Sequence, residues 1–371
     1  MKKNIDRPFL ILTLVLLGLG FIIFSSASLG LLAKVYGEGK YQAVVFNQIV
    51  LGVCGGLIAM YITSRIPYTL WRKYAFYLLI ASFGLMLLVF TPLGIFHGGA
   101  RRWLDIGGFS VQPAEFYKIG FVLYLACWFA SVKNKVSTWK QGTLPFIILI
   151  GLSAGLILMQ PDTDTFMVIA IAGTAMYVTA GGKWRDLIIM GLVGILGLTA
   201  LVFQRPYLMN RIQSFIDPSK DALGSSYQIQ QSLIAIGSGG LTGRGFGQSI
   251  QKFNFLPEPI GDSIFAVAAE EFGFIGSVTI ILLFLLFAFR GLRIAKSAPD
   301  TFATLVVVGI ITLIITQSFL NIAAMLAIIP LSGTPLLFIS HGGTAMFFTL
   351  ASTGVIMNIS RHISKQKMLQ K

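Results

Sequence analysis

Long runs of apolar residues recur along the whole chain and are separated by short polar segments. Several runs have 18 residues or more, which is enough for an α-helix to cross about 30 Å of hydrocarbon. A membrane β-barrel would instead give shorter segments of alternating polarity. The pattern predicts an all-α polytopic membrane protein with about ten transmembrane helices. The expected spans are 9–29, 42–63, 74–91, 113–131, 143–159, 164–181, 187–203, 263–289, 301–329 and 336–359.

Charged residues are scarce and unevenly placed along the chain. They make up 11% of the residues, against roughly 25% in an average soluble domain. If successive connections lie on alternate sides of the membrane, one side holds 18 of the 28 Lys and Arg and only 3 of the 14 acidic residues. Basic residues gather on the cytoplasmic side, so both termini are expected there. We read the basic excess as a topology signal and a contact with anionic lipids, and not as a nucleic-acid site.

Two of the expected extracytoplasmic connections are long. They are about 92–112 and 204–262, the second lying between the seventh and eighth spans. Loops of this length in a compact protein are usually functional or disordered. The second loop contains YQIQQSLIAI, whose apolar residues recur at helical spacing, so we expect amphipathic helices at the membrane surface. Any chemistry is therefore expected outside the cell and close to the bilayer.

Carboxylates are concentrated in one stretch, FLPEPIGDSIFAVAAEE (255–271), which contains four of the acidic residues. The eighth span is expected to begin near Ser263, which places Asp262 at the outer end of that helix. One interpretation is a helix N-cap, which would lower the pKa of the carboxyl group. The other is a catalytic carboxylate. The residues alone leave both interpretations open.

Further charges lie in the first long loop and at the outer ends of the expected spans. A charge near the centre of a membrane helix costs about 3 kcal/mol, and the cost falls toward the interface. Several such residues on one side therefore predict either a hydrated pocket or internal ion pairs, and both remain open. The pair at 115 and 118 is three residues apart and shares one helical face. These residues are Arg101, Arg102, Glu115, Lys118, Asp162 and Asp164.

A glycine-rich run, GSGGLTGRGFGQS (237–249), follows the apolar stretch of the second long loop. It does not follow a strand in a βαβ unit, so a dinucleotide site lacks its structural context. The run fits a tight-turning loop. It also fits a backbone that approaches an anionic head group, because Arg244 and Lys252 lie nearby.

Four segments carry a resemblance to a known family. They are GARRWLDIGGFSVQPAEFYK, QPDTDT, the stretch from YQIQQSLIAI to AAEEFGFIG, and NIAAMLAIIPLSGTPLLFISHGGTAM. Together they resemble the SEDS family, whose members include FtsW, RodA and SpoVE, over nearly the entire chain. The motif QKF…LPEP is closer to FtsW or SpoVE than to RodA.

The resemblance implies a single membrane domain over residues 1–371 with the activity of a peptidoglycan glycosyltransferase. Such an enzyme polymerises lipid II into glycan strands on the outer face of the bacterial cytoplasmic membrane. The implied partners are lipid II, the nascent strand, membrane lipids and a class B penicillin-binding protein, the transpeptidase that cross-links the strands. A lipid II flippase and a non-catalytic scaffold for the transpeptidase are the alternatives.

Individual roles also follow from the resemblance. The essential acid of the family's large loop corresponds to Asp262, the candidate general base, which would accept a proton while undecaprenyl pyrophosphate leaves. A divalent cation bridging the diphosphate to an outer carboxylate is the one cofactor considered, and no spacing in the sequence identifies its ligands. The residues expected to bind substrate are Arg101, Arg102, Glu115, Lys118, Asp162, Arg244 and Lys252.

The chain departs from the family's usual residues at four positions. Ile260 and Gly261 replace a His-Thr pair before the aspartate, and His341 replaces a tyrosine. Asp164 stands where the family usually has glycine. The first two are expected to affect local geometry, and the added charge of Asp164 is expected to change the pairing of Asp162.

Overall fold

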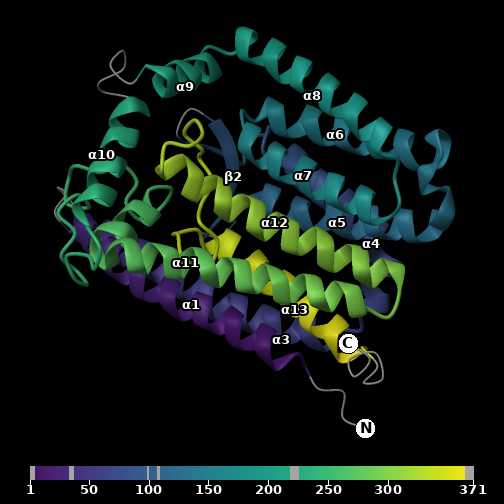
Figure 1. The fold of residues 1–371 in the computed structure, drawn as a ribbon, viewed down its shortest axis with the longest axis horizontal. Helices are drawn as coiled ribbons and strands as arrows, with labels where there is room; N and C mark the ends of the chain where they lie inside the picture. Colours follow the sequence, from purple (N-terminus) through teal and green to yellow (C-terminus); the bar gives the residue numbers. More distant parts are fainter. Residues whose placement is uncertain (1–4, 33–36, 98–99, 107–108, 218–224, 364–371) are drawn as a thin grey trace.

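The computed structural model describes residues 5–32, 37–97, 100–106, 109–217 and 225–363, and these are mostly helical (Figure 1). Three strands form a small antiparallel sheet in the order β1-β2-β3, with bounds β1 (Gly94–His97), β2 (Ala100–Ile106) and β3 (Phe109–Val111). The helices are α1 (Arg7–Ser28), η1 (Leu29–Leu31), α2 (Gly37–Asn47), η2 (Gln48–Gly55), α3 (Gly56–Arg65), α4 (Tyr68–Leu88), α5 (Pro113–Val132), η3 (Lys133–Ser137), η4 (Trp139–Thr143), α6 (Leu144–Met159), α7 (Thr163–Thr179), α8 (Trp184–Gln204), α9 (Pro206–Ile216), α10 (Ser225–Ser238), α11 (Ile264–Ser297), α12 (Thr301–Met325) and α13 (Gly343–Arg361).

The expected spans all fall on helices. Within the described residues, eight helices are long and apolar enough to cross a membrane. The other two expected spans correspond to α4 and to α7, an apolar helix of 17 residues. The helical membrane fold is therefore confirmed, whereas the number of spans and the side on which the termini lie stay predictions.

Several helices begin where the sequence offers a cap. Asp6, Asp162 and Asp300 each accept a hydrogen bond from the backbone N–H three residues later, at 3.0, 3.2 and 2.8 Å respectively. Such a side chain satisfies one of the N–H groups that a helix start leaves without a partner. The starts of α1, α7 and α12 are thus fixed by local sequence.

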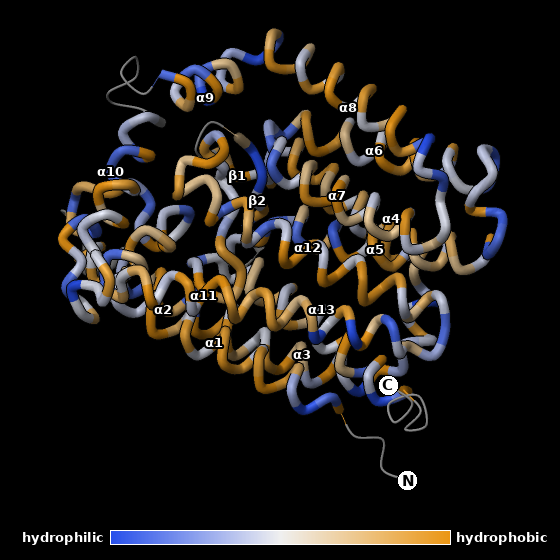
Figure 2. The backbone as a smooth tube through the Cα atoms, in the orientation of Figure 1, coloured by the Kyte–Doolittle hydropathy of each residue, from blue (hydrophilic) through white to orange (hydrophobic). Residues whose placement is uncertain are grey.

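The apolar side chains divide between the interior and the outer surface of the bundle. Helix α12 packs against α5, α7 and α11, and α13 packs against α3. Helix α8 lies at the edge of the bundle (Figures 1 and 2). Its side chains are almost all exposed apart from Asp186. A soluble protein rarely exposes such a large apolar surface, so this face is the one that lipid covers.

The start of α1 and the end of α13 lie at the opposite end of α11 from the second long loop. The backbone N–H of Asp6 donates to Ser360 Oγ at 3.1 Å, so the start of α1 lies beside the end of α13. The carboxylate of Asp6 also pairs with Arg290, near the end of α11, at 2.6 Å. Asp262 precedes the opposite end of this 34-residue helix, which corresponds to about 50 Å of rise.

Two features differ from the expectation. The first long loop contains a sheet, although no strands were expected. Gly-Gly pairs at 98–99 and 107–108 stand between its strands in the sequence, and such pairs are typical of hairpins. The expected spans 301–329 and 336–359 are also too long, because residues 326–342 are non-helical. Pro330, Gly333 and Pro335 interrupt the helical pattern there.

Candidate functional site

Asp262 occupies a turn immediately before α11. The backbone N–H groups of Gly261 and Ser263 both donate to the carbonyl of Glu258, at 3.1 and 3.2 Å. The cap position of α11 belongs to Ser263, and no side-chain capping bond is present there. The N-cap interpretation of Asp262 is therefore wrong, and its carboxylate is available for another role.

The non-helical segment 326–342 holds the backbone around Asp262. Asn321 of α12 donates from Nδ2 to the carbonyls of Asp262, at 2.7 Å, and of Thr334, at 2.8 Å. These bonds join α12, the turn before α11 and the segment 326–342. Irregular backbone among membrane helices is stable only if its polar groups are paired within the protein. The Asn321 amide provides two of those pairings.

The turn before α11 is held by hydrogen bonds even though positions 260, 261 and 341 depart from the residues expected there. The N–H of His341 donates to the carbonyl of Ile260 at 2.7 Å. Ser340 Oγ donates to the carbonyl of Gly261 at 2.8 Å. At positions 260, 261 and 341 the anchoring group belongs to the backbone, so it does not depend on which side chain is present.

Three charged side chains converge above Gly333. Asp164 Oδ2 accepts from Arg211 Nη1 at 3.1 Å and from the N–H of Gly333 at 2.9 Å. A Cβ placed on Gly333 would lie 3.8 Å from Asp164 Oδ2, 3.8 Å from Asp262 Oδ2 and 3.5 Å from Arg211 Nη2. The two aspartates and the arginine therefore share one small space, which is left open because residue 333 has no side chain.

The surroundings of Asp262 change its acidity. Burial raises the pKa of Asp262 to about 7, and the negative charges of Glu258 and Asp164 add to the increase. The cations Arg211 and Arg102 oppose it but are weaker. A carboxyl group with a pKa close to 7 is matched to accepting a proton at neutral pH. The shift is opposite in sign to the lowering expected from helix capping.

Arg102 and Asp162 meet at the turn between α6 and α7. The guanidinium of Arg102 donates to the carbonyls of Gln160, at 3.2 Å, and Pro161. Asp162 is buried and caps α7, so its carboxylate supports this turn from inside. Arg101 is the exposed neighbour of Arg102 on β2, and adjacent strand residues point to opposite faces.

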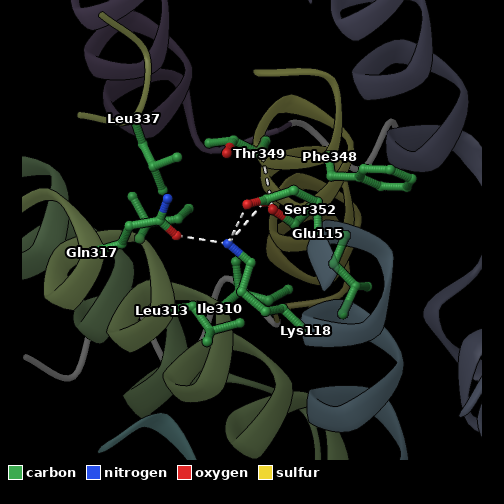
Figure 3. A pocket seen from close by; sticks show the side chains of 11 residues that line it. Glu115, Lys118, Ile310, Leu313, Gln317, Leu337, Phe348, Thr349 and Ser352 are labelled. Atoms are coloured by element: carbon green, nitrogen blue, oxygen red, sulfur yellow. Dashed lines mark hydrogen bonds and ion pairs between the residues drawn. The ribbon is translucent and has the colours of Figure 1, made fainter. Parts of the chain in front are cut away.

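Glu115 and Lys118 form a buried pair in a pocket between α5, α12 and α13 (Figure 3). Lys118 Nζ lies 2.8 Å from a carboxylate oxygen of Glu115 and 2.6 Å from Gln317 Oε1. Gln317 Nε2 in turn donates to the carbonyl of Pro335 at 3.5 Å. The pair is therefore connected through α12 to the same segment, 326–342, that anchors Asp262.

Lys252 and Arg244 are tied to the start of α11. Lys252 Nζ is fully buried and donates to Glu271 at 2.8 Å, to Ser26 at 2.9 Å and to the carbonyl of Gly247 at 2.9 Å. Arg244 Nε lies 3.4 Å from Glu270 Oε1. All three hydrogens of the Lys252 ammonium are donated to partners within the protein, so this lysine has a structural role at the start of α11.

The glycine-rich run packs against a break in α11. Gly273 has φ 67° and interrupts the helix, which frees the carbonyls of the preceding turn. The N–H groups of Arg244 and Gly245 donate to two of them, at Glu270 and Glu271, at 3.0 Å each. A Cβ at Gly243, where φ is +83°, would lie 2.1 Å from the Glu271 carbonyl oxygen. The close approach fits the tight-turning loop.

Three polar residues of the site were not singled out from the sequence. Gln317 and Asn321 are four residues apart in an otherwise apolar span, a signal for an internal polar face. Arg211 lies on α9, which forms part of the expected amphipathic region. Its pairing with Asp164 requires the second long loop to fold back over α7, which no local pattern indicates.

Metal ligands are not identified by the arrangement of side chains. The part of the chain that the structure describes contains no group of three or more His, Cys, Asp and Glu residues able to hold a metal ion. A divalent cation held jointly with a diphosphate therefore stays a prediction.

Comparison with known proteins places this geometry in a family. The model of the cell cycle protein family of FtsW, RodA and SpoVE matches residues 7–365. Stage V sporulation protein E of Bacillus subtilis is 38% identical over 97% of this chain and 98% of its own length. A probable peptidoglycan glycosyltransferase FtsW of Geobacter sp. strain M18 is 34% identical over 96% of this chain and 97% of its own.

Solved structures share the fold. RodA, the rod shape determining protein of Thermus thermophilus, aligns with a TM-score of 0.72 and 25% identity over 97% of this chain and 98% of that one. A chain from a structure described as coordinating polymerization and crosslinking in a peptidoglycan synthase complex aligns with a TM-score of 0.79 and 24% identity over 97% and 99%. The chain therefore belongs to the FtsW, RodA and SpoVE family of helical membrane proteins.

Proposed function

We propose that this protein is a peptidoglycan glycosyltransferase that polymerises lipid II into glycan strands. Its relatives include proteins named as probable peptidoglycan glycosyltransferases that match nearly the whole chain. The observation that carries the proposal is the Asp262 carboxyl group on the turn before α11, which shares the space above Gly333 with Asp164 and Arg211. Burial raises its pKa to about 7. A base of this strength, next to cations, matches glycosyl transfer from a diphosphate.

In the proposed reaction, the 4-hydroxyl oxygen of one lipid II forms a bond to the anomeric carbon of the growing strand. The bond from that carbon to the diphosphate oxygen breaks, and undecaprenyl pyrophosphate leaves with the bonding electrons. The hydroxyl proton passes to the carboxylate of Asp262. A positioned base of this kind contributes a factor of about 10² to 10⁴ in rate.

Cations near Asp262 are proposed to stabilise the leaving diphosphate. The positive charges of Arg102 and Arg211 act on Asp262 and partly oppose the increase in its pKa. Guanidinium groups form charge-assisted hydrogen bonds to phosphate oxygens, so we assign Arg102 and Arg211 this role, with the exposed Arg101 at the entrance. Lys118 is proposed to act further inside, oriented by Glu115.

The location and partner belong to the same proposal. We place the protein in the bacterial cytoplasmic membrane with Asp262 outside the cell, since the start of α1 and the basic residues Arg290, Arg293 and Lys296 lie toward the opposite end of α11 from Asp262. We further propose a class B penicillin-binding protein as the transpeptidase partner that cross-links the strands. The peptidoglycan synthase complex that shares the fold is described as combining polymerization with crosslinking.

The test is to give the purified full-length protein fluorescent lipid II in liposomes, with and without the transpeptidase. Glycan polymer together with released undecaprenyl pyrophosphate supports the proposal. Lipid II that crosses the bilayer without forming polymer would instead identify a flippase. If neither product appears although the transpeptidase binds, the protein is a scaffold.

A further inference from the structure

We propose that Asp164 is a positioning residue for glycosyl transfer: its carboxylate holds Arg211 and the backbone of Gly333 around Asp262. The inference rests on the proposed function and adds a residue that the family resemblance does not supply, because the family usually has glycine at this position. The geometry that carries it is the convergence of side chains above Gly333.

Asp164 joins three segments that are distant in the sequence. It lies in the first turn of α7, and a single carboxylate oxygen, Oδ2, binds both α9 and the segment 326–342. The contacts are 3.1 Å to Arg211 Nη1 and 2.9 Å to the N–H of Gly333. The second long loop is thereby tied over α7 on the side where Asp262 lies.

The contacts of Asp164 with Arg211 and Gly333 also determine which charged groups lie near Asp262. Asp164 Oδ2 and Asp262 Oδ2 each lie 3.8 Å from the same point above Gly333, so they are separated by no more than twice that distance. Arg211 forms an ion pair with Asp164 and also interacts electrostatically with Asp262. Glu258 and Arg102 are the other charged groups that act on Asp262. The N–H of His341 donates to the carbonyl of Ile260, two residues before Asp262.

Two substitutions are expected to move the pH dependence of polymerisation in opposite directions. Asp164→Asn removes a negative charge near Asp262, so the ionised form of Asp262 becomes easier to reach and the acid limb moves to lower pH. Arg211→Gln removes a positive charge and moves the limb to higher pH. Each shift is expected to be about half a unit to one and a half units for charges at this separation.

The experiment measures the initial rate of polymerisation of fluorescent lipid II by the reconstituted full-length protein from pH 5 to 9. The double variant Asp164→Asn with Arg211→Gln is expected to fall between the two single variants. Asp164→Gly, the residue usual in the family, gives a second route to the same charge change. It should also lower the midpoint, and it keeps the test usable if the asparagine variant fails to fold.

Asp6→Asn is the matched control. It weakens an Asp–Arg pair with Arg290, whose guanidinium contacts are 2.6 and 2.9 Å, near the other end of α11. Asparagine also retains capping ability at a helix start. The midpoint of this variant is expected to equal that of the unmodified protein.

The outcomes separate this inference from the proposed function. Opposite shifts for Asp164→Asn and Arg211→Gln support the positioning role. Unchanged midpoints, or shifts in the same direction, overturn it if Asp262→Asn is inactive. If Asp262→Asn polymerises lipid II at the normal rate, Asp262 is not the base, and the inference is overturned together with that assignment.

Discussion

The acidity of Asp262 predicts how the rate of glycan polymerisation depends on pH. The pKa of this carboxyl group is raised to about 7, first by burial and then by Glu258 and Asp164. Because the ionised form accepts the proton, the rate should rise with pH through 7 and level off above it. Below the midpoint, each unit of pH should lower the rate about tenfold, since one protonated carboxyl group blocks the reaction.

The measurement is the initial rate with lipid II well below saturation, where the pH profile reports the free protein, from pH 5 to 9, in liposomes of constant lipid composition. At pH 6 about one tenth of the maximal rate is expected for a single group with a pKa of 7. Release of undecaprenyl pyrophosphate and growth of polymer should follow the same curve. A rate that stays nearly level from pH 5 to 9 would refute the reasoning, because Asp262 would then have the ordinary pKa of an aspartate, about 4, and be ionised throughout.

Three further predictions concern the elements around the site. Lys252→Met leaves Glu271 buried without its cation and should destabilise the fold by about 3 to 5 kcal/mol, seen as a lower Tm; an unchanged Tm would contradict the buried pair. Gly243→Ala brings a Cβ to within 2.1 Å of the Glu271 carbonyl at φ +83° and should also lower the Tm, whereas wild-type stability would contradict the tight packing. Asn321→Ala unpairs the Asp262 carbonyl, so polymerisation should fall at least tenfold, about 1.4 kcal/mol; a normal rate would show that this anchor is dispensable.

The helical membrane fold was accessible from sequence because hydropathy depends on long windows of residues. The same windows missed the end of α12, since AIIPLSGTPLLFIS is apolar although it is not helical. An apolar, non-helical segment is stable there because Asn321 Nδ2 donates to the carbonyl of Thr334 and Ser340 Oγ accepts from the N–H of Leu336. Such long-range pairing leaves no periodic signal in the sequence.

The site was predicted only in part. Asp262 and Asp164 stood out as scarce charges at the outer ends of spans, and Arg102 as a charge in the first long loop. Their convergence depends on Gly333, which by itself predicts only a turn. It also depends on Arg211, which lies on a helix more than forty residues from Asp164 in the sequence. Lys252 was expected to face substrate because it is cationic, but Glu271 and the break in α11 account for its burial.

The central claim is that Asp262 takes the proton during glycosyl transfer, and the most direct measurement is the polymerisation rate of Asp262→Asn. Asparagine keeps the size of the side chain and leaves the backbone bond from Asn321 in place, so the variant should fold and bind lipid II normally. The account predicts a rate reduced by about 10² to 10⁴ at pH 8. Glycan strands made at the normal rate by the folded variant would contradict it.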